Sequence, residues 1–199
     1  MTTHTAGSDP TTDTAPTLPH VPAAPAAPAA PAARTVRGTC PSPFGELLLT
    51  GVETGDGCAL TSLSLPGRPA APAVPEPGRA EETFAQARRE LDAYFAGRLT
   101  RFSLPLAPAG TPFQLRVWQA LDEVPYGTTT SYGELAARLG LSRVETRAVG
   151  RALGANPLLL VRPCHRVIGA DGSLRGYAGG VERKAWLLTH EGALPPALV

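Results

Sequence analysis

The sequence predicts two folded domains: a small α/β domain over residues 34–106, and a mainly α-helical domain over residues 107–199 that contains a helix-turn-helix. Three observations lead to this prediction. Residues 1–33 form a tail rich in proline and alanine, which cannot build a core. Two apolar runs flank a glycine turn at residues 53–57, and two helix-start patterns flank a tight turn at residues 140–142.

Composition limits the possible partners and compartments. The chain of 199 residues has a formal net charge of +1, so any nucleic-acid site must be a local patch. Its cysteines, Cys40, Cys58 and Cys164, are odd in number and lack Cys-x-x-Cys spacing, which favours a reducing compartment over a disulfide framework. No apolar run approaches the roughly 18 residues of a membrane span, and no signal-peptide pattern is present. We therefore expect a cytoplasmic protein.

The tail, residues 1–33, ends in a repeat that places proline at every third position. Proline blocks both helix and sheet hydrogen bonding, so the tail is expected to be disordered or polyproline-like. No function is assigned to it.

A hairpin and a helix are expected in the first domain. Residues 45–50 and 58–63 are predicted to be strands, and the turn between them contains two glycines. A loop rich in proline and alanine covers residues 66–80, and an amphipathic helix follows over residues 81–96, closed by Gly97. Its expected apolar stripe is Phe84, Arg88, Leu91 and Phe95.

The second domain begins with a capped helix. Thr111 is the predicted N-cap and Pro112 the first helical residue, and the helix stops before Pro125. Its apolar face is expected to be Phe113, Val117, Trp118 and Leu121.

Two short helices then follow in a helix-turn-helix pattern. Residues 131–134 and 142–145 each match a capping box, and Gly140 ends the first helix. The second helix runs to about Gly154, and arginines on one of its faces recur every four residues: Arg143, Arg147 and Arg151. Such a stripe is either an ordinary solvated face or a nucleic-acid contact.

The remaining elements surround a cysteine. An apolar run at residues 158–161 leads into the loop that carries Cys164, and Asp171-Gly172 forms a turn. The last helix covers residues 181–190 and ends at Gly192; Trp186, Leu187 and Leu188 are expected to point inward.

Cys164 is followed directly by His165, which suggests nucleophilic chemistry. A thiol attacks as thiolate, and thiolates form near a base or a cation. Neighbouring side chains of an extended segment point to opposite faces, so this pair requires a turn, with which Pro163 and Gly169 are consistent.

The order and spacing of several motifs are similar to those of the methylated-DNA–protein-cysteine methyltransferases, also called O6-alkylguanine-DNA alkyltransferases. The resemblance is dense over residues 111–192 and thin over residues 35–106. The motifs are TPFQLRVW at 111–118, VPYG at 124–127, TSY at 130–132, RAVG at 147–150, NP at 156–157, PCHRVIG at 163–169, GYAGG at 176–180 and LLTHE at 187–191.

The resemblance implies a single-turnover repair reaction in which an alkyl group moves from O6 of guanine, and less readily from O4 of thymine, to Cys164. His165 matches the family's base, which acts through a bound water, and Glu191 matches the acid that orients it. Asn156 matches the asparagine that buttresses the loop. The thioether product is not a leaving group, so each molecule should react once.

The resemblance also implies double-stranded DNA as the partner, because a stacked guanine must be flipped out to reach a thiol. Arg147 matches the arginine that fills the vacated space, and Tyr132 matches the tyrosine that crowds the 3′ phosphate, with Arg143 and Arg151 as further DNA contacts. The expected substrate pocket consists of Tyr177, Val167, Ala178 and Leu153. We expect a monomer.

No cofactor is expected. Some members of the family bind structural zinc in the N-terminal part through cysteine and histidine, but here Cys40 and Cys58 have no histidine nearby, so no metal is predicted.

Two departures and two rival functions remain open. The segment between Tyr132 and Arg147 looks one residue longer than in relatives, which affects the register of the recognition helix. Arg162 replaces a usually apolar residue; it is solvated, paired with an acid, or bound to a phosphate. A Cys-His-Glu group also occurs in cysteine hydrolases, and alkyltransferase-like proteins bind the lesion without repair, although these carry another residue where Cys164 stands.

Overall fold

The computed structural model describes Met1 and residues 34–55, 57–67 and 82–195. Contacts divide the chain into Met1–Ala32 and Ala33–Val199, and every helix and strand below belongs to the second unit. The tail predicted over residues 1–33 and most of the loop predicted over residues 66–80 lie outside the described residues. None of the described helices has the length and apolar run that crossing a membrane requires.

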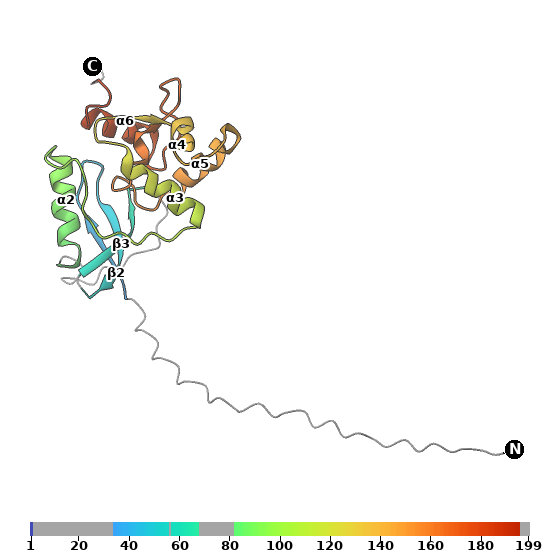
Figure 1. Ribbon diagram of the computed structural model, residues 1–199. Helices are drawn as coiled ribbons and strands as arrows, with labels where there is room; N and C mark the ends of the chain where they lie inside the picture. The colour runs from blue at the N-terminus through green and yellow to red at the C-terminus, as the bar shows by residue number, and fades with distance from the viewer. Residues whose placement is uncertain (2–33, 56, 68–81, 196–199) are drawn as a thin grey trace. The chain divides into compact units, whose positions relative to one another are not determined.

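The N-terminal part is a three-stranded antiparallel sheet of order β1-β2-β3 (Figure 1). Its strands are β1 (Thr35–Cys40), β2 (Leu47–Thr54) and β3 (Gly57–Ser64). The β2-β3 hairpin confirms the prediction, and a bulge between Thr50 and Gly51 shifts its register. β1 was not predicted, because Gly38 and Arg37 interrupt the apolar alternation by which a strand is recognised.

Helix α2 (Ala85–Phe95) lies alongside the sheet in Figure 1. Gly97, which follows it, has φ +69°, as its predicted role in closing the helix requires. The predicted apolar stripe is only half right: Arg88 and Phe95 are partly exposed. The buried residues follow i, i+3, i+7 and i+10 spacing, which keeps them on one face; they are Phe84, Ala87, Leu91 and Tyr94.

Helix α3 (Pro112–Ala120) begins the C-terminal part as predicted. Thr111 caps it, and Gln114 completes a capping box by bonding back to the Thr111 amide. A 3₁₀ turn, η1 (Leu121–Glu123), ends the helix before Pro125. Val117, Trp118 and Leu121 are buried, whereas Phe113 is only partly so.

Helix α4 (Tyr132–Arg138) and helix α5 (Thr146–Gly154) pack against each other. Ser131 caps α4 with Glu134 in a capping box, and Ser142 and Glu145 form a second box, as predicted. The second helix nevertheless starts later than expected, because residues Arg143–Glu145 form a 3₁₀ turn, η2, before α5 begins.

The last elements bring the cysteine loop next to α4. They are η3 (Cys164–Arg166), β5 (Val167–Ile168) and α6 (Val181–His190). β5 pairs in parallel with β4 (Thr130–Ser131), the strand that leads into α4. Leu187 and Leu188 are buried as predicted, but the expectation for Trp186 is wrong. Its indole is 39% exposed and stacks on His190 with ring centroids 4.9 Å apart.

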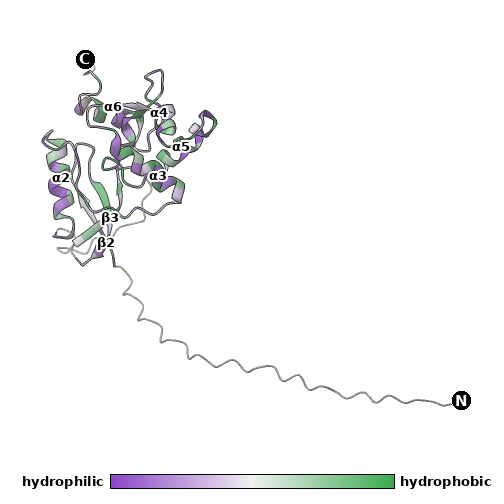
Figure 2. Cartoon of the chain, viewed as in Figure 1, coloured by the Kyte–Doolittle hydropathy of each residue, from purple (hydrophilic) through white to green (hydrophobic). Residues whose placement is uncertain are grey.

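One apolar core joins the sheet, α2 and the C-terminal helices. The backbone amides of Leu60 and Leu63 donate to the carbonyls of Pro105 and Pro157, which ties β3 to segments that follow in the chain. α2 carries polar and apolar residues in alternating bands (Figure 2). The predicted fold class, a small sheet with a helix followed by a mainly helical part, is confirmed, and its division near residue 106 stays a prediction.

Candidate active site

Cys164 lies at the start of η3, over a buried apolar run at residues 158–161. Cys164 is 6% exposed, and the side-chain amide of Asn156 donates to its sulfur at 3.1 Å. The same Asn156 amide donates to the Arg162 carbonyl at 2.9 Å, and its oxygen accepts from the Leu158 amide at 3.0 Å. Asn156 therefore fixes the loop on both sides of the thiol, because its side chain bonds to three points of that loop.

His165 and Glu191 form the buried pair next to this thiol. His165 Nε2 lies 2.9 Å from Glu191 Oε1, and both side chains are inaccessible to solvent. Arg166 binds the same carboxylate through both oxygens, Nε to Oε2 at 2.8 Å and Nη2 to Oε1 at 3.0 Å. Tyr94, on α2, donates its hydroxyl to Oε1 at 2.8 Å. The carboxylate of Glu191 is thus held by three side chains.

The charges of this cluster favour a neutral histidine. Burial alone would raise the pKa of Glu191, but hydrogen bonds from His165 and Arg166 lower it to about 2. Burial lowers the pKa of His165, and Arg166 adds to that effect against the opposing pull of Glu191. An ionised carboxylate accepts only, so Nε2 carries the proton and the buried Nδ1 is the basic nitrogen. Nδ1 has no hydrogen-bond partner among the described protein groups.

Lys184, on α6, is a buried ammonium below this loop. Its Nζ donates to the carbonyls of Val167 at 2.6 Å and Arg175 at 2.9 Å. Burial lowers its pKa to about 8, against the opposing field of Cys164, so the side chain is mostly charged at neutral pH. Lys184 therefore links the cysteine loop to the segment that faces it and places a positive charge near the sulfur.

A hollow of about 410 Å³ opens onto the thiol of Cys164. Of the predicted pocket residues, Tyr177, Ala178 and Leu153 line it, together with Tyr132. Val167 does not; it is buried behind the loop and contributes its carbonyl to Lys184. The other lining residues are Gly150, Gly154, Arg175 and Gly176.

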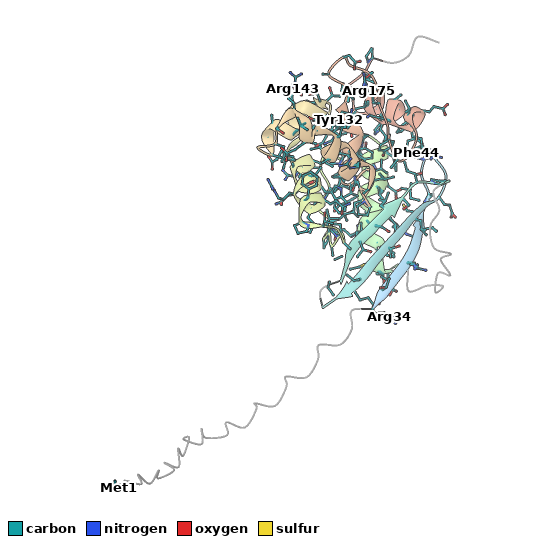
Figure 3. The ribbon with its side chains drawn as sticks, turned by 90° about the vertical axis from the view of Figure 1, so that its right-hand side faces the viewer. Met1, Arg34, Phe44, Tyr132, Arg143 and Arg175 are labelled. Atoms are coloured by element: carbon teal, nitrogen blue, oxygen red, sulfur yellow. The ribbon has the colours of Figure 1, made fainter. Side chains whose placement is uncertain are left out.

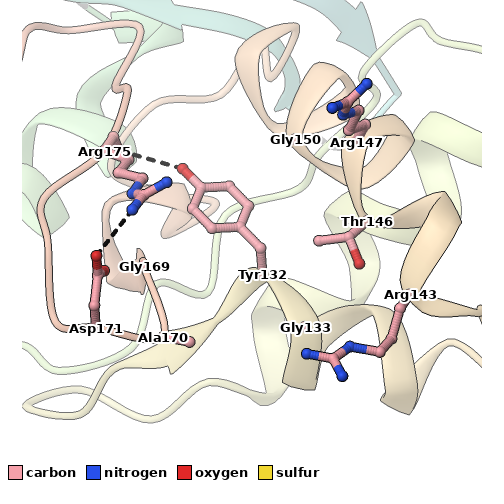
Figure 4. A pocket seen from close by; sticks show the side chains of 10 residues that line it. All are labelled: Tyr132, Gly133, Arg143, Thr146, Arg147, Gly150, Gly169, Ala170, Asp171 and Arg175. Atoms are coloured by element: carbon pink, nitrogen blue, oxygen red, sulfur yellow. Dashed lines mark hydrogen bonds and ion pairs between the residues drawn. The ribbon is translucent and has the colours of Figure 1, made fainter.

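A second hollow, of about 650 Å³, adjoins the first (Figure 4). Arg143 and Arg147 lie on one side, Asp171 and Arg175 on the other, and Tyr132 stands between them. Figure 3 shows Tyr132, Arg143 and Arg175 at the end of the helical part away from the three-stranded sheet. Arg151, predicted to share a face with the other arginines of its helix, is exposed on α5 but lines neither hollow.

Arg162 is paired with an acid, one of the three possibilities left open by the sequence. Its Nη1 lies 2.7 Å from Asp122 Oδ2 and donates to the Trp118 carbonyl at 2.8 Å. The side chain is 13% exposed. The guanidinium is therefore neither solvated nor directed at the hollows.

Sequence reasoning missed four residues of the site: Tyr94, Arg166, Lys184 and Arg175. Tyr94 and Lys184 are buried and meet the site only through the fold, so no local pattern marks them. Arg166 had a signal, since it directly follows the Cys164-His165 pair, but a lone arginine is usually solvated. Among the described residues, no group of three or more His, Cys, Asp or Glu is arranged to hold a metal ion.

Two family profiles match nearly all of the described chain after the tail. Residues 112–193 match a profile described as the DNA binding domain of 6-O-methylguanine DNA methyltransferase. Residues 35–108 match the profile of the ribonuclease-like domain of the same protein.

Individual relatives agree with the profiles. A curated Mycobacterium leprae protein, "Methylated-DNA--protein-cysteine methyltransferase", is 48% identical over 154 residues, which is 75% of this chain and 88% of the relative. The crystal structure of Mycobacterium tuberculosis O6-methylguanine methyltransferase has a TM-score of 0.70 at 44% identity and covers 83% of this chain and 97% of its own. The Mycobacterium tuberculosis OGT structure in complex with DNA has a TM-score of 0.69 at 46% identity, with 80% and 94% covered.

Proposed function

Because the chain belongs to the methylated-DNA–protein-cysteine methyltransferases, enzymes of DNA repair, we propose that it transfers an alkyl group from O6 of guanine in double-stranded DNA to Cys164. Transfer from O4 of thymine is the slower variant of the same reaction. The observation that carries the proposal is a buried thiol at the floor of a hollow, next to a neutral histidine whose other nitrogen is held by an ionised carboxylate.

The proposed reaction transfers one proton and one alkyl group. Cys164 loses its proton to Nδ1 of His165, through a bound water as in the family, and the sulfur attacks the alkyl carbon. The S–C bond forms while the C–O6 bond breaks, and the electron pair passes to the guanine, which takes up a proton. Glu191 stabilises the imidazolium so formed, because its carboxylate lies 2.9 Å from Nε2.

Two further buried groups favour the thiolate form of Cys164. The amide of Asn156 donates to the sulfur, and a hydrogen bond to the charged form favours thiolate. Lys184 adds a positive charge nearby, which also favours thiolate. Both groups are buried and held by other hydrogen bonds, so they are already in position before the substrate binds.

The reaction should occur once per molecule. A thioether is not displaced by water, and the other two cysteines belong to different strands: Cys40 is the last residue of β1 and Cys58 lies in β3. Burial raises the pKa of both thiols, which makes them poor nucleophiles. No second thiol is therefore suited to regenerate Cys164.

DNA is proposed to lie across the second hollow. α4 and α5 are the two helices of the predicted helix-turn-helix, and α5 would enter the minor groove, whose readout is largely degenerate. Arg147 would fill the space left by the flipped base, with Arg143 and Arg151 as further contacts to DNA. Tyr132, shared by both hollows, would stand where the base turns inward. The protein would act as a monomer.

Intact-mass measurement tests the reaction. After incubation with a duplex that holds one O6-methylguanine, the protein should gain one methyl group, located at Cys164 by peptide mapping. Cys164→Ser should gain none, because a hydroxyl is not ionised near neutral pH.

The same measurement separates the rival functions. Lesion binding by an unmodified protein, without any methyl loss from the DNA, would indicate a damage sensor. An unmodified protein that hydrolyses acyl or amide bonds instead would indicate a cysteine hydrolase. Product in excess of protein would overturn the single-turnover proposal.

A further inference from the structure

We propose that Arg175 binds a phosphate of the flipped nucleotide and so positions its base over Cys164. This assignment rests on the proposed function, and it adds a residue that neither the sequence patterns nor the family resemblance assigns.

The two hollows share a rim. The lining residues common to both are Tyr132, Gly150 and Arg175, and Arg175 is the only cationic side chain among them. A flipped nucleotide would place its base in the hollow of Cys164 and leave its backbone in the other. Its phosphate then lies at the shared rim, which is where the Arg175 guanidinium stands.

The Arg175 side chain is fixed but accessible. Nη2 lies 2.8 Å from Asp171 Oδ2, and Nε donates to Ser173 Oγ at 2.8 Å. Asp171 in turn accepts from the Ser173 hydroxyl at 2.6 Å, so the three residues form a closed ring of bonds. The side chain is still 67% exposed, and these bonds use only Nε and Nη2 of the guanidinium. One face of the guanidinium therefore remains available to an anion.

The backbone at Arg175 is anchored as well. Its carbonyl accepts from the Tyr132 hydroxyl at 3.2 Å and from Lys184 Nζ at 2.9 Å. Figure 4 shows the bond from Tyr132 and the ion pair with Asp171 on the same side of the hollow. Because Tyr132 lines the Cys164 hollow and Lys184 also bonds to the cysteine loop at Val167, a phosphate held by Arg175 is held at a fixed place relative to the thiol.

The charges of the second hollow favour an anion at this place. Arg143 and Arg147 face Arg175 across it, and Asp171 is the single acid in its lining. A solvated i,i+4 ion pair between Asp171 and Arg175 contributes little to stability. The arginine can therefore be replaced without unfolding the protein, which makes its contribution to DNA binding measurable.

Salt dependence of binding is the first test. In a Cys164→Ser background, which cannot react, we would compare Arg175→Ser with Arg98→Ser, an exposed arginine that lines neither hollow. On a duplex with one O6-methylguanine, Arg175→Ser should reduce the salt slope by about 0.9, the value for one phosphate contact. Arg98→Ser should leave it unchanged. An unchanged slope for Arg175→Ser would overturn the proposal.

The second test removes the negative charge of the phosphate instead. A neutral methylphosphonate at the contacted phosphate beside the lesion should slow duplex repair by the unaltered protein several-fold. It should slow repair by Arg175→Ser no further, because the two changes remove the same contact. The assignment would be contradicted if, at both flanking phosphates, the methylphosphonate slowed repair by Arg175→Ser as much as it slows repair by the unaltered protein.

Free O6-benzylguanine separates this inference from the proposed function. It carries no phosphate, so Arg175→Ser should lose several-fold less rate with it than with duplex, although Arg175 also lines the Cys164 hollow. If the unaltered protein accepts the methyl group at Cys164 and Arg175→Ser repairs duplex as fast as the unaltered protein, only the proposal for Arg175 is contradicted. If the unaltered protein gains no alkyl group from either substrate, the proposed function fails.

Discussion

The hydroxyl of Tyr94 donates a 2.8 Å hydrogen bond to Oε1 of Glu191, although 97 positions separate the two residues in the chain. Tyr94 belongs to α2 of the N-terminal part, whereas Glu191 closes α6 and holds the histidine next to the thiol. The N-terminal part therefore contributes directly to the geometry of the candidate active site.

Tyr94→Phe removes this bond and little else, because the ring is buried and keeps its packing. Loss of a hydrogen bond to a charged group should lower the free energy of unfolding by about 1.5–3 kcal/mol. Urea denaturation measures this. Reaction with free O6-benzylguanine should slow by a similar factor to duplex repair, since both require His165. A loss confined to duplex would place Tyr94 in DNA binding instead.

Arg166→Met should move the acidic limb of the pH-rate profile to higher pH. Arg166 lowers the pKa of His165, and without it the negative charge of Glu191 acts on the imidazole uncompensated. The histidine is then protonated over a wider range, and a protonated base cannot accept the thiol proton. The profile would be measured with free O6-benzylguanine.

Arg166→Lys is the matched control, because it keeps the charge and loses the two-point grip on the carboxylate. It should shift the limb less than Arg166→Met. Both variants should be less stable, Arg166→Met by about 3–5 kcal/mol, since it leaves a buried carboxylate with one cationic partner fewer. A limb that moves to lower pH in Arg166→Met would contradict this account of His165.

Acid should destabilise the protein in two steps. The folded pKa of His165 is below its ordinary 6.5, so its contribution is complete above that pH and is lost as pH falls below it. The folded pKa of Glu191 is about 2 against an ordinary 4.5, so its contribution is complete above 4.5 and is lost towards pH 2. Urea midpoints across pH should fall accordingly. Glu191→Gln should flatten the lower step, and an unflattened step would show that other carboxyls cause it.

Local patterns predicted much of this fold, because they are read from neighbouring residues. The β2-β3 hairpin follows from its glycine turn, and the capping boxes at Ser131 and Ser142 follow from residues three positions apart. The start of α5 was missed because a capping box does not distinguish a 3₁₀ turn from a full α-helical turn.

Some residues of the candidate site were likewise predictable from the sequence, and others were not. Cys164 and His165 are adjacent in sequence, and the resemblance brought in Glu191 and Asn156, which the structure places beside them. Tyr94 and Arg166 meet Glu191 across 97 and 25 positions. A buried ion cluster has no sequence signal of its own, because each charged residue looks like an ordinary surface residue until its partner is known.

Arg147→Ala should slow repair of duplex at least tenfold and leave reaction with free O6-benzylguanine nearly unchanged. Arg147 is exposed on the wall of the second hollow, away from the thiol. Flipping costs a few kcal/mol of stacking, and only the duplex substrate requires it. Single-turnover rates on both substrates provide the measurement. Equal losses would indicate that Arg147 has a structural role.

Arg162→Leu tests the residue where the sequence departs from the family's habit. Its guanidinium is occupied by Asp122 and the Trp118 carbonyl, so it has little capacity to hold a phosphate. We expect an unchanged salt slope for binding to lesion-free duplex. The free energy of unfolding should fall by about 1–2 kcal/mol, because Asp122 and the carbonyl lose a partner.

A variant of Asp122 tests its contribution to the ion pair with Arg162. Asp122→Asn keeps a polar partner for Arg162 and removes the opposite charge, so it should cost less stability than Arg162→Leu. If the arginine instead binds phosphate in the complex with DNA, Arg162→Leu would reduce the salt slope by about 0.9, and Asp122→Asn, by releasing the guanidinium, would strengthen binding. That result would mean that the ion pair opens when DNA binds.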